Sequence, residues 1–153
     1  MKREYKVTIG SISHGTLRPE DLIDAYAWEL RQFAKNEGEG RLTVQEAILL
    51  AMCDSWLETA GEECEPDMAK AEELLDDLTE ALESRAPPYC YFGNTQGDGS
   101  DFGFWPDMDA INDLPCVENS DEARDLGEDC RYVNDHGNVT VYGGDGSVII
   151  DFV

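Results

Sequence analysis

The hydrophobic pattern of the chain changes at Pro87-Pro88, and this change constrains the fold more than any other feature. Before the two prolines, apolar residues recur every three or four positions, which is the spacing of amphipathic helices. After them, short apolar runs alternate with turn residues, as in strands and hairpins. With 153 residues the chain has about the length of one domain. We therefore expect a single domain over residues 1–153, with a mainly helical half (1–84) and a mainly β half (85–153).

Three helices are predicted before the prolines, over residues 19–36, from Thr43 to about Ala60, and over residues 67–84. Pro19 occupies a favoured first helical position, and Pro66 can precede a helix but not continue one. Thr43 and Glu46 have the spacing of a capping box, which predicts the start of the second helix. Because this second segment is apolar nearly all round, we expect it to be the central and most buried helix.

Short apolar runs after the prolines predict strands over residues 89–93, 101–105, 130–134, 138–143 and 147–153. The turn sequences at 135–138 and 144–147 predict that the last three runs form an antiparallel meander.

Three further segments complete the pattern. Residues 5–9 alternate between apolar and polar side chains, as in a strand. A short helix is expected from Pro106 through Ile111, and an acidic loop or frayed helix from Glu118 to Asp129. Together these elements predict an α+β fold in which a three-helix layer packs on a small antiparallel β-sheet.

The charge of the chain excludes one class of function and favours another. The formal net charge is −23, from 34 acidic and 11 basic residues. Residues 1–43 sum to zero, residues 44–84 to −12 and residues 85–153 to −11. Direct binding to DNA, RNA or an anionic membrane is excluded, because it needs Lys and Arg to replace the counterions of phosphates. The uneven distribution indicates an acidic face and a basic partner.

The cellular location is predicted from what the sequence lacks. The N-terminus has no apolar core of signal-peptide length, and no stretch reaches the 18 apolar residues of a membrane span. The five cysteines never form a CxxC pair, which favours reduced thiols. We expect a soluble protein of the cytoplasm, or of the host cell cytoplasm if a phage encodes it.

Two acidic segments are the candidate binding sites. On the third predicted helix the acids fall within an arc of about 140°, opposite an apolar face. A solvated surface is the ordinary alternative, but Lys70 is the only base between Thr43 and Arg85, so like charges repel along the helix. Together with the second acidic segment, the predicted partner-binding residues are Glu72, Glu73, Asp76, Asp77, Glu80, Glu83, Glu118, Asp121, Glu122, Asp125, Glu128 and Asp129.

No metal, cofactor or catalytic residue is predicted. Five aspartates invite a Ca²⁺ or Mg²⁺ site, but no glutamate closes an EF-hand loop from any of them, and Asp-Gly pairs are typical of hairpin turns; they are Asp98, Asp101, Asp107, Asp109 and Asp113. Both histidines, His14 and His136, lie in loop sequence, and Cys90 between two tyrosines is typical of a small buried side chain. The sequence therefore favours a binding protein over an enzyme.

Two resemblances support this interpretation. The segments SHGTLRPEDLIDAY (13–26) and PPYCYFGNTQGDGSDFGFWP (87–106) are similar to segments of uncharacterised small acidic phage and bacterial proteins. The overall composition resembles the DNA-mimic inhibitors with which phages and mobile elements block restriction enzymes, CRISPR effectors or repair glycosylases. The second resemblance implies an anti-CRISPR or anti-restriction inhibitor whose partner is a basic nucleic-acid-binding protein, such as a nuclease, a CRISPR effector or a restriction enzyme.

Two other hypotheses remain open from the residues alone. The first is an acidic adaptor or immunity-type protein that binds a basic partner away from any nucleic-acid site, anchored by an aromatic residue such as Trp28 or Trp105. The second is a metal-dependent enzyme or Ca²⁺-binding module that uses the aspartates between Asp98 and Asp113.

Overall fold

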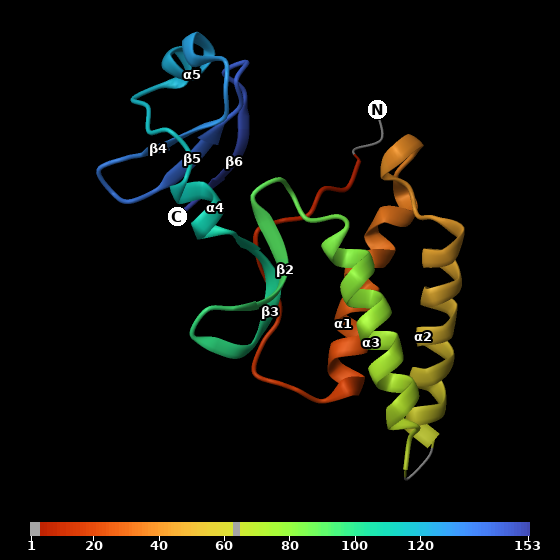
Figure 1. Ribbon diagram of the computed structural model, residues 1–153. Helices are drawn as coiled ribbons and strands as arrows, with labels where there is room; N and C mark the ends of the chain where they lie inside the picture. The colour runs from red at the N-terminus through yellow and green to blue at the C-terminus, as the bar shows by residue number, and fades with distance from the viewer. Residues whose placement is uncertain (1–3, 63–64) are drawn as a thin grey trace. The chain divides into compact units, whose positions relative to one another are not determined.

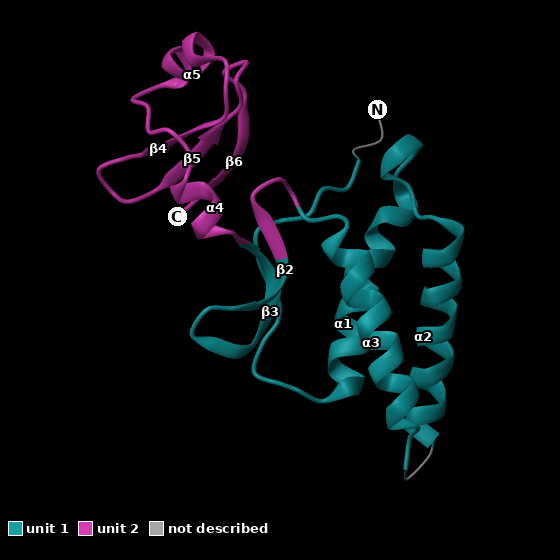
Figure 2. Cartoon of the chain, in the orientation of Figure 1, with its two compact units in different colours: residues 1–86, 92–105 teal, residues 87–91, 106–153 magenta. Residues whose placement is uncertain are grey.

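The computed structural model describes residues 4–62 and 65–153 of the chain, and it divides them into two compact units (Figure 2). The first unit contains the residues up to Ala86 together with Phe92–Trp105, and the second contains Pro87–Tyr91 and Pro106–Val153. The hairpin residues 92–105 therefore group with the helices of the first unit. The expectation of a single domain over 1–153 stays a prediction.

The first unit is built on three helices that lie side by side (Figure 1). They are α1 (Pro19–Arg31), α2 (Val44–Glu62) and α3 (Met68–Glu83), and the short 3-10 helices η1 (Gln32–Lys35) and η2 (Gly38–Gly40) lie between α1 and α2. The Thr43 hydroxyl accepts the Glu46 N–H at 3.1 Å and the Glu46 carboxylate accepts the Thr43 N–H at 2.9 Å, which confirms the predicted capping box. The Asp67 carboxylate caps α3 by accepting the Lys70 N–H at 3.0 Å.

The prediction that the second helix is the most buried one is wrong. Val44, Ile48 and Met52 of α2 are 74%, 56% and 37% exposed. The central helix is α1, which packs against both α2 and α3 and also against strand β1 (Gly10–Ser13). Because α2 contacts its neighbours on one side, its apolar residues on the opposite side stay in solvent; apolar composition all round the helix therefore does not indicate burial here.

The first sheet has the strand order β1-β3-β2, with β2 spanning Cys90–Thr95 and β3 spanning Asp98–Pro106. Strands β1 and β3 are antiparallel, with Gly10 opposite Phe104. The first strand therefore begins at Gly10 and not in the predicted 5–9 segment. The backbone N–H and C=O of Tyr5 bond instead to the side-chain amide of Asn36, at 2.6 and 2.9 Å, which ties this segment to the end of η1.

The second sheet belongs to the second unit and has the order β4-β5-β6. Its strands are β4 (Cys130–Val133), β5 (Val139–Tyr142) and β6 (Val148–Phe152), and both pairings are antiparallel, which confirms the predicted meander. The predicted short helix is present as α4 (Met108–Asn112), and the acidic segment forms α5 (Ser120–Leu126). Gly127 ends α5 in the left-handed conformation, at φ 69°.

The fold class is α+β, as predicted, but the strands of the described residues form two three-stranded sheets where a single sheet was expected. The physical reason is that the strands have separate apolar partners. Phe92 and Phe104 join the core of the first unit, where Phe92 meets Tyr26 edge to face at 5.0 Å. In the second unit Cys130 packs with Val117 and Ala123. In the part of the chain that the structure describes, no helix is long and apolar enough to span a membrane.

Candidate functional site

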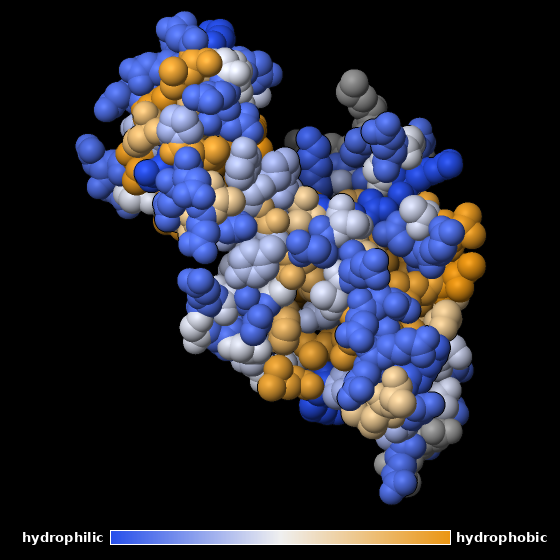
Figure 3. All heavy atoms as spheres, in the orientation of Figure 1, coloured by the Kyte–Doolittle hydropathy of each residue, from blue (hydrophilic) through white to orange (hydrophobic). Residues whose placement is uncertain are grey.

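Helix α3 separates core from charge, as its sequence pattern predicts. Ala71, Leu74, Leu78 and Leu82 are fully buried and fix the helix in the core of the first unit. The acidic side chains are all exposed and make up the α3 acidic face, consisting of Glu72, Glu73, Asp76, Asp77, Glu80 and Glu83. Hydrophilic residues cover α3 in the space-filling view, whereas an apolar patch lies over the first half of α2 (Figure 3).

Two of the six acids on this face have partners within the protein. The Glu73 carboxylate lies 3.3 Å from the Lys70 ammonium, and the Glu83 carboxylate accepts the Phe92 N–H at 2.5 Å. Among the described residues, the other four have neither an ion pair nor a hydrogen bond from their side chains; these are Glu72, Asp76, Asp77 and Glu80. The α3 acidic face therefore presents uncompensated carboxylates from a rigid helix.

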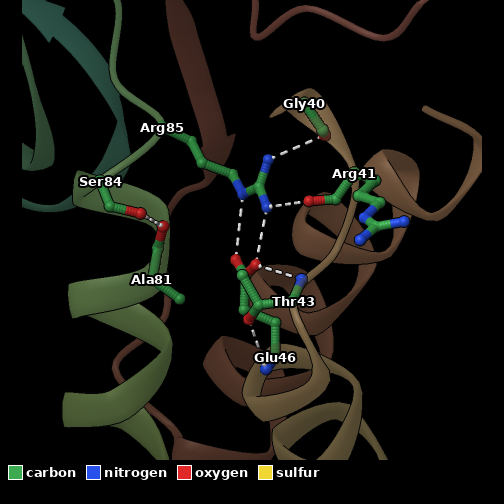
Figure 4. Close-up of polar contacts among 7 residues, drawn as sticks. All are labelled: Gly40, Arg41, Thr43, Glu46, Ala81, Ser84 and Arg85. Atoms are coloured by element: carbon green, nitrogen blue, oxygen red, sulfur yellow. Dashed lines mark hydrogen bonds and ion pairs between the residues drawn. The ribbon is translucent and has the colours of Figure 1, made fainter. Parts of the chain in front are cut away.

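Beside the C-terminal end of α3, the side chain of Arg85 ties the α3 end to the start of α2 (Figure 4). Its guanidinium donates to both carboxylate oxygens of Glu46, at 3.0 and 2.7 Å, and to the carbonyls of Gly40 and Arg41 at 3.1 and 2.9 Å. It also lies 4.3 Å from the centre of the Phe33 ring. Burial raises the pKa of Glu46, but hydrogen bonds from Arg85 and Thr43 outweigh this effect and hold the pKa below its ordinary value.

Next to this ion pair, a hollow of about 510 Å³, the α2–α3 pocket, opens between the segment 39–43, α2 and α3. Its lining includes Asp77 and Glu80 of the α3 acidic face, together with Glu39 and Arg41. Sequence reasoning predicted the two α3 acids but missed the pocket and the pair of Glu46 with Arg85. Two sequence features could have indicated this ion pair. Glu46 is the acid of a capping box on an apolar helix, and Arg85 is the base at the end of the acidic helix that follows.

The second predicted acidic segment lies in the second unit, so the structure does not bring the two sets of acids together within one unit. Three of its six acids serve the local fold. Asp121 pairs with Arg124 at 3.0 Å, the Glu122 carboxylate accepts the Glu118 N–H at 2.9 Å, and Asp129 accepts the phenol O–H of Tyr89. The side chains that remain exposed and unpaired among the described residues are Glu118, Asp125 and Glu128.

Two of the five aspartates of the metal hypothesis, Asp98 and Asp107, support a turn and a helix end. The Asp98 carboxylate accepts the N–H and O–H of Ser100, at 3.0 and 2.8 Å, and Asp107 caps α4 by accepting the Ala110 N–H at 3.2 Å. Within residues 4–62 and 65–153, no group of three or more His, Cys, Asp or Glu side chains is placed to hold a metal ion.

Two of the cysteines, Cys53 and Cys90, show the reverse of nucleophile activation. Burial, with a smaller effect of Asp107, raises the pKa of the Cys90 thiol to about 11, whereas a nucleophilic cysteine needs a lowered pKa. Burial and the nearby carboxylates of Asp54 and Asp77 raise the pKa of the Cys53 thiol to about 11, although Arg31 acts in the opposite direction. Cys53, Cys90, Cys116 and Cys130 are free, and Cys64 lies outside the described residues.

The two tryptophans of the adaptor hypothesis differ in their surroundings. Trp28, on α1, is 64% exposed. Trp105 is half-buried, and its indole N–H donates to the Gly93 carbonyl at 2.9 Å. Only Trp28 of these two has the exposure that an aromatic anchor needs.

No protein-family model matches this chain, and neither a curated protein nor a solved structure matches it. The resemblance to small acidic phage and bacterial proteins therefore stays a prediction. The function has to be inferred from the residues and their geometry.

Proposed function

We propose that this protein is an acidic DNA-mimic inhibitor without catalytic activity, which occupies the nucleic-acid-binding site of a defence or DNA-processing protein. The partner is a basic protein such as a CRISPR effector, a restriction enzyme or another nuclease, and inhibition is steric and electrostatic competition with DNA. Such partners act in the cytoplasm, where we place this protein as well.

The α3 acidic face is the observation that carries the proposal. Its six acids lie between positions 72 and 83, a distance of roughly 16 Å along the helix at a rise of 1.5 Å per residue. Over that length one DNA strand presents about five phosphates. Because the buried leucines on the opposite side hold the helix in place, the backbone positions that carry the carboxylates are fixed. Arg and Lys side chains that grip a DNA strand therefore find a similar density of negative charge.

The internal energetics of α3 favour a partner over plain solvation. Glu72 with Asp76, and Asp76 with Glu80, are like charges four positions apart on an exposed face. Each such pair destabilises a helix by a few tenths of a kcal/mol. No basic side chain among the described residues compensates these three acids. A basic surface that neutralises them relieves this repulsion on binding.

The second acidic segment is proposed as an additional contact. Its exposed acids flank and line α5, and Glu118, Asp125 and Glu128 have no partner among the described residues. Asp121, Glu122 and Asp129 already have bonds within the unit, so they contribute less to binding. The proposal therefore ranks the α3 acidic face first.

The test is competition with DNA. The protein is used to isolate its partner from native host cells, and the binding of that partner to a fluorescent DNA duplex is then followed by anisotropy. We expect competitive displacement of the duplex, with an affinity that falls steeply with salt because the contacts are charge-assisted pairs. A complex that survives 1 M NaCl, or a partner that still binds DNA normally inside the complex, would contradict mimicry.

Charge-reversal variants localise the effect. The triple variant Glu73→Lys, Asp77→Lys and Glu80→Lys should abolish inhibition and leave the fold intact, because all three side chains are exposed. The matched control reverses three exposed acids outside α3, Asp24, Glu58 and Glu62, and changes the net charge by the same amount. Equal loss in both variants would indicate that overall charge, and not the α3 acidic face, is responsible.

The second candidate function is an adaptor or immunity-type protein, and the exposure of Trp28 is the observation that favours it. In that case a basic partner binds away from its nucleic-acid site, and the acids mainly steer association. Trp28→Ala should then weaken binding by tenfold or more, as at aromatic hot spots. The triple reversal on α3 should mainly slow the association rate. Under mimicry, the triple reversal on α3 should instead weaken binding more than Trp28→Ala does.

A further inference from the structure

The α2–α3 pocket has a lining that suits one kind of guest. Its wall carries three carboxylates without partners among the described residues, those of Glu39, Asp77 and Glu80. Leu49 and Ala81 supply apolar surface in the same hollow. A guest that fits both chemistries has a cationic head and an aliphatic stem, and arginine and lysine side chains have this structure.

The charge balance of the pocket favours a cation. Arg85 and Glu46 also line it, but they neutralise each other through two hydrogen bonds. Arg41 is then the only base that opposes the three carboxylates in this lining. The hollow therefore has an uncompensated negative charge, and its volume of about 510 Å³ exceeds what one side chain needs.

The wall of the pocket already holds a guanidinium of the protein itself. Arg85 is bound there by a carboxylate, by two backbone carbonyls and by an aromatic ring. Its planar fork engages both oxygens of Glu46, which is geometry that an ammonium group cannot reproduce. The carboxylates of Asp77 and Glu80 beside it are exposed, and the guanidinium that Glu46 already binds is the precedent for an arginine side chain at this site.

We propose that the α2–α3 pocket receives an arginine side chain of the basic partner. This inference rests on the proposed function and deepens it, because it turns part of the α3 acidic face into a site that binds one side chain. Asp77 and Glu80 contact the guanidinium, Leu49 and Ala81 contact its stem, and Glu39 closes the opposite wall. Glu72 and Asp76 lie outside the pocket lining and act only through their charge.

The probe is acetyl-hexaarginine amide, and the neutral isostere hexacitrulline is its control. Binding to the full chain is measured by calorimetry, and methyl NMR signals follow where the peptide lies. We expect hexaarginine to shift the methyl signals of Leu49 and Ala81, and to leave that of the exposed Leu17 unchanged. Hexacitrulline should shift none of them. Shifts at Leu17 alone, or equal shifts with hexacitrulline, would contradict the binding of arginine in the α2–α3 pocket.

Two charge-matched double variants separate the pocket from the charged face. Asp77→Asn with Glu80→Gln should weaken hexaarginine binding about tenfold, because each removes a charge-assisted contact in a hollow. Asp76→Asn with Glu72→Gln removes the same charge from the same helix outside the pocket and should weaken binding only about twofold, as exposed pairs do. Circular dichroism checks that all variants fold.

The third variant, Arg41→Gln, should tighten binding, because it removes the base that opposes the guest. If both double variants weaken hexaarginine binding equally and Arg41→Gln has no effect, the α2–α3 pocket does not bind the arginine side chain, while the role of the α3 acidic face remains supported. If neither double variant weakens binding, the pocket and the α3 acidic face both fail.

Discussion

The ion pair of Arg85 with Glu46 should be a main determinant of the stability of the first unit, and replacing Arg85 with Met tests this. The substitution removes two hydrogen bonds to Glu46, two to the carbonyls of Gly40 and Arg41, and the contact with the Phe33 ring. The side chains of Arg85 and Glu46 are only 12% and 10% exposed. Removing one partner of a buried pair costs about 3–5 kcal/mol.

The lower end of that range, about 3 kcal/mol, is expected for Arg85→Met, because Glu46 keeps its bond from the Thr43 N–H and the methionine retains apolar contact with Phe33. Arg85→Lys should cost less, about 1–2 kcal/mol, since it keeps the charge but loses the fork that reaches four acceptors. Glu46→Gln should cost about 2 kcal/mol, because the amide can still accept from Thr43.

The assay is urea unfolding followed by tryptophan fluorescence. All three tryptophans, Trp28, Trp56 and Trp105, belong to the first unit, so fluorescence reports the unfolding of that unit. The double variant of Arg85→Met with Glu46→Gln completes a thermodynamic cycle, and we expect a coupling energy of about 1.5–3 kcal/mol. Additive effects, or a loss below about 1 kcal/mol for Arg85→Met, would show that the pair contributes little.

Three other predictions follow from the same structure. Leu78 is fully buried, so Leu78→Ala should lower the free energy of unfolding by about 2–5 kcal/mol. Ile48 lies on the exposed side of α2, so Ile48→Ser should change it by no more than about 0.5 kcal/mol. Equal losses in urea unfolding would contradict the packing of α2. Gly103→Ala should destabilise the pairing of β1 with β3 by about 1–3 kcal/mol, because a Cβ there would meet the Gly10 carbonyl oxygen at 2.0 Å; thermal unfolding measures this, and an unchanged Tm would refute it. The pKa of Glu46 is lowered in the folded state, so its ionised carboxylate stabilises the fold above the unfolded pKa, about 4.3, and this stabilisation is lost as the pH falls through the folded pKa. The wild type should therefore lose more stability than Glu46→Gln between pH 5 and 3. Acid titration followed by fluorescence measures this, and parallel curves would contradict the lowered pKa.

Local signals in the sequence predicted the elements that depend on local physics. The capping box of Thr43 and Glu46 sets the start of α2, and it was readable because capping bonds join residues three positions apart. Pro66 indicated the start of α3, whereas the Asp67 cap was found only in the structure. The meander of β4, β5 and β6 was predictable for a similar reason, since short turn sequences join its strands.

The features that sequence reasoning missed depend on contacts between distant residues. Whether Ile48 is buried depends on which side of α2 faces α1 and α3, and an apolar helix gives no direction. The bond between Arg85 and Glu46 joins residues 39 positions apart, and the Asn36 amide that holds Tyr5 lies 31 positions away. For the candidate site, the amphipathic pattern predicted which acids of α3 are exposed, but the pocket required the 39–43 segment to lie beside them.

The α3 acidic face allows one more prediction, in which stability and binding change in opposite directions. Asp76 is exposed, and Glu72 and Glu80 lie four positions before and after it. Asp76→Lys replaces two repulsive pairs with attractive ones, and since each pair changes a helix by about 0.2–0.5 kcal/mol, we expect a gain of about 0.5–1 kcal/mol at low salt. The gain should shrink in 1 M NaCl, because salt screens exposed charges.

The same substitution should weaken inhibition of the partner and binding of hexaarginine, because it places a cation in the array that a basic surface has to contact. Urea unfolding at two salt concentrations and calorimetry measure the two effects on one variant. A more stable variant that binds less well would show that the carboxylates of α3 destabilise the free protein and act in binding. A variant that gains stability and keeps full inhibition would show instead that Asp76 belongs to an ordinary solvated surface.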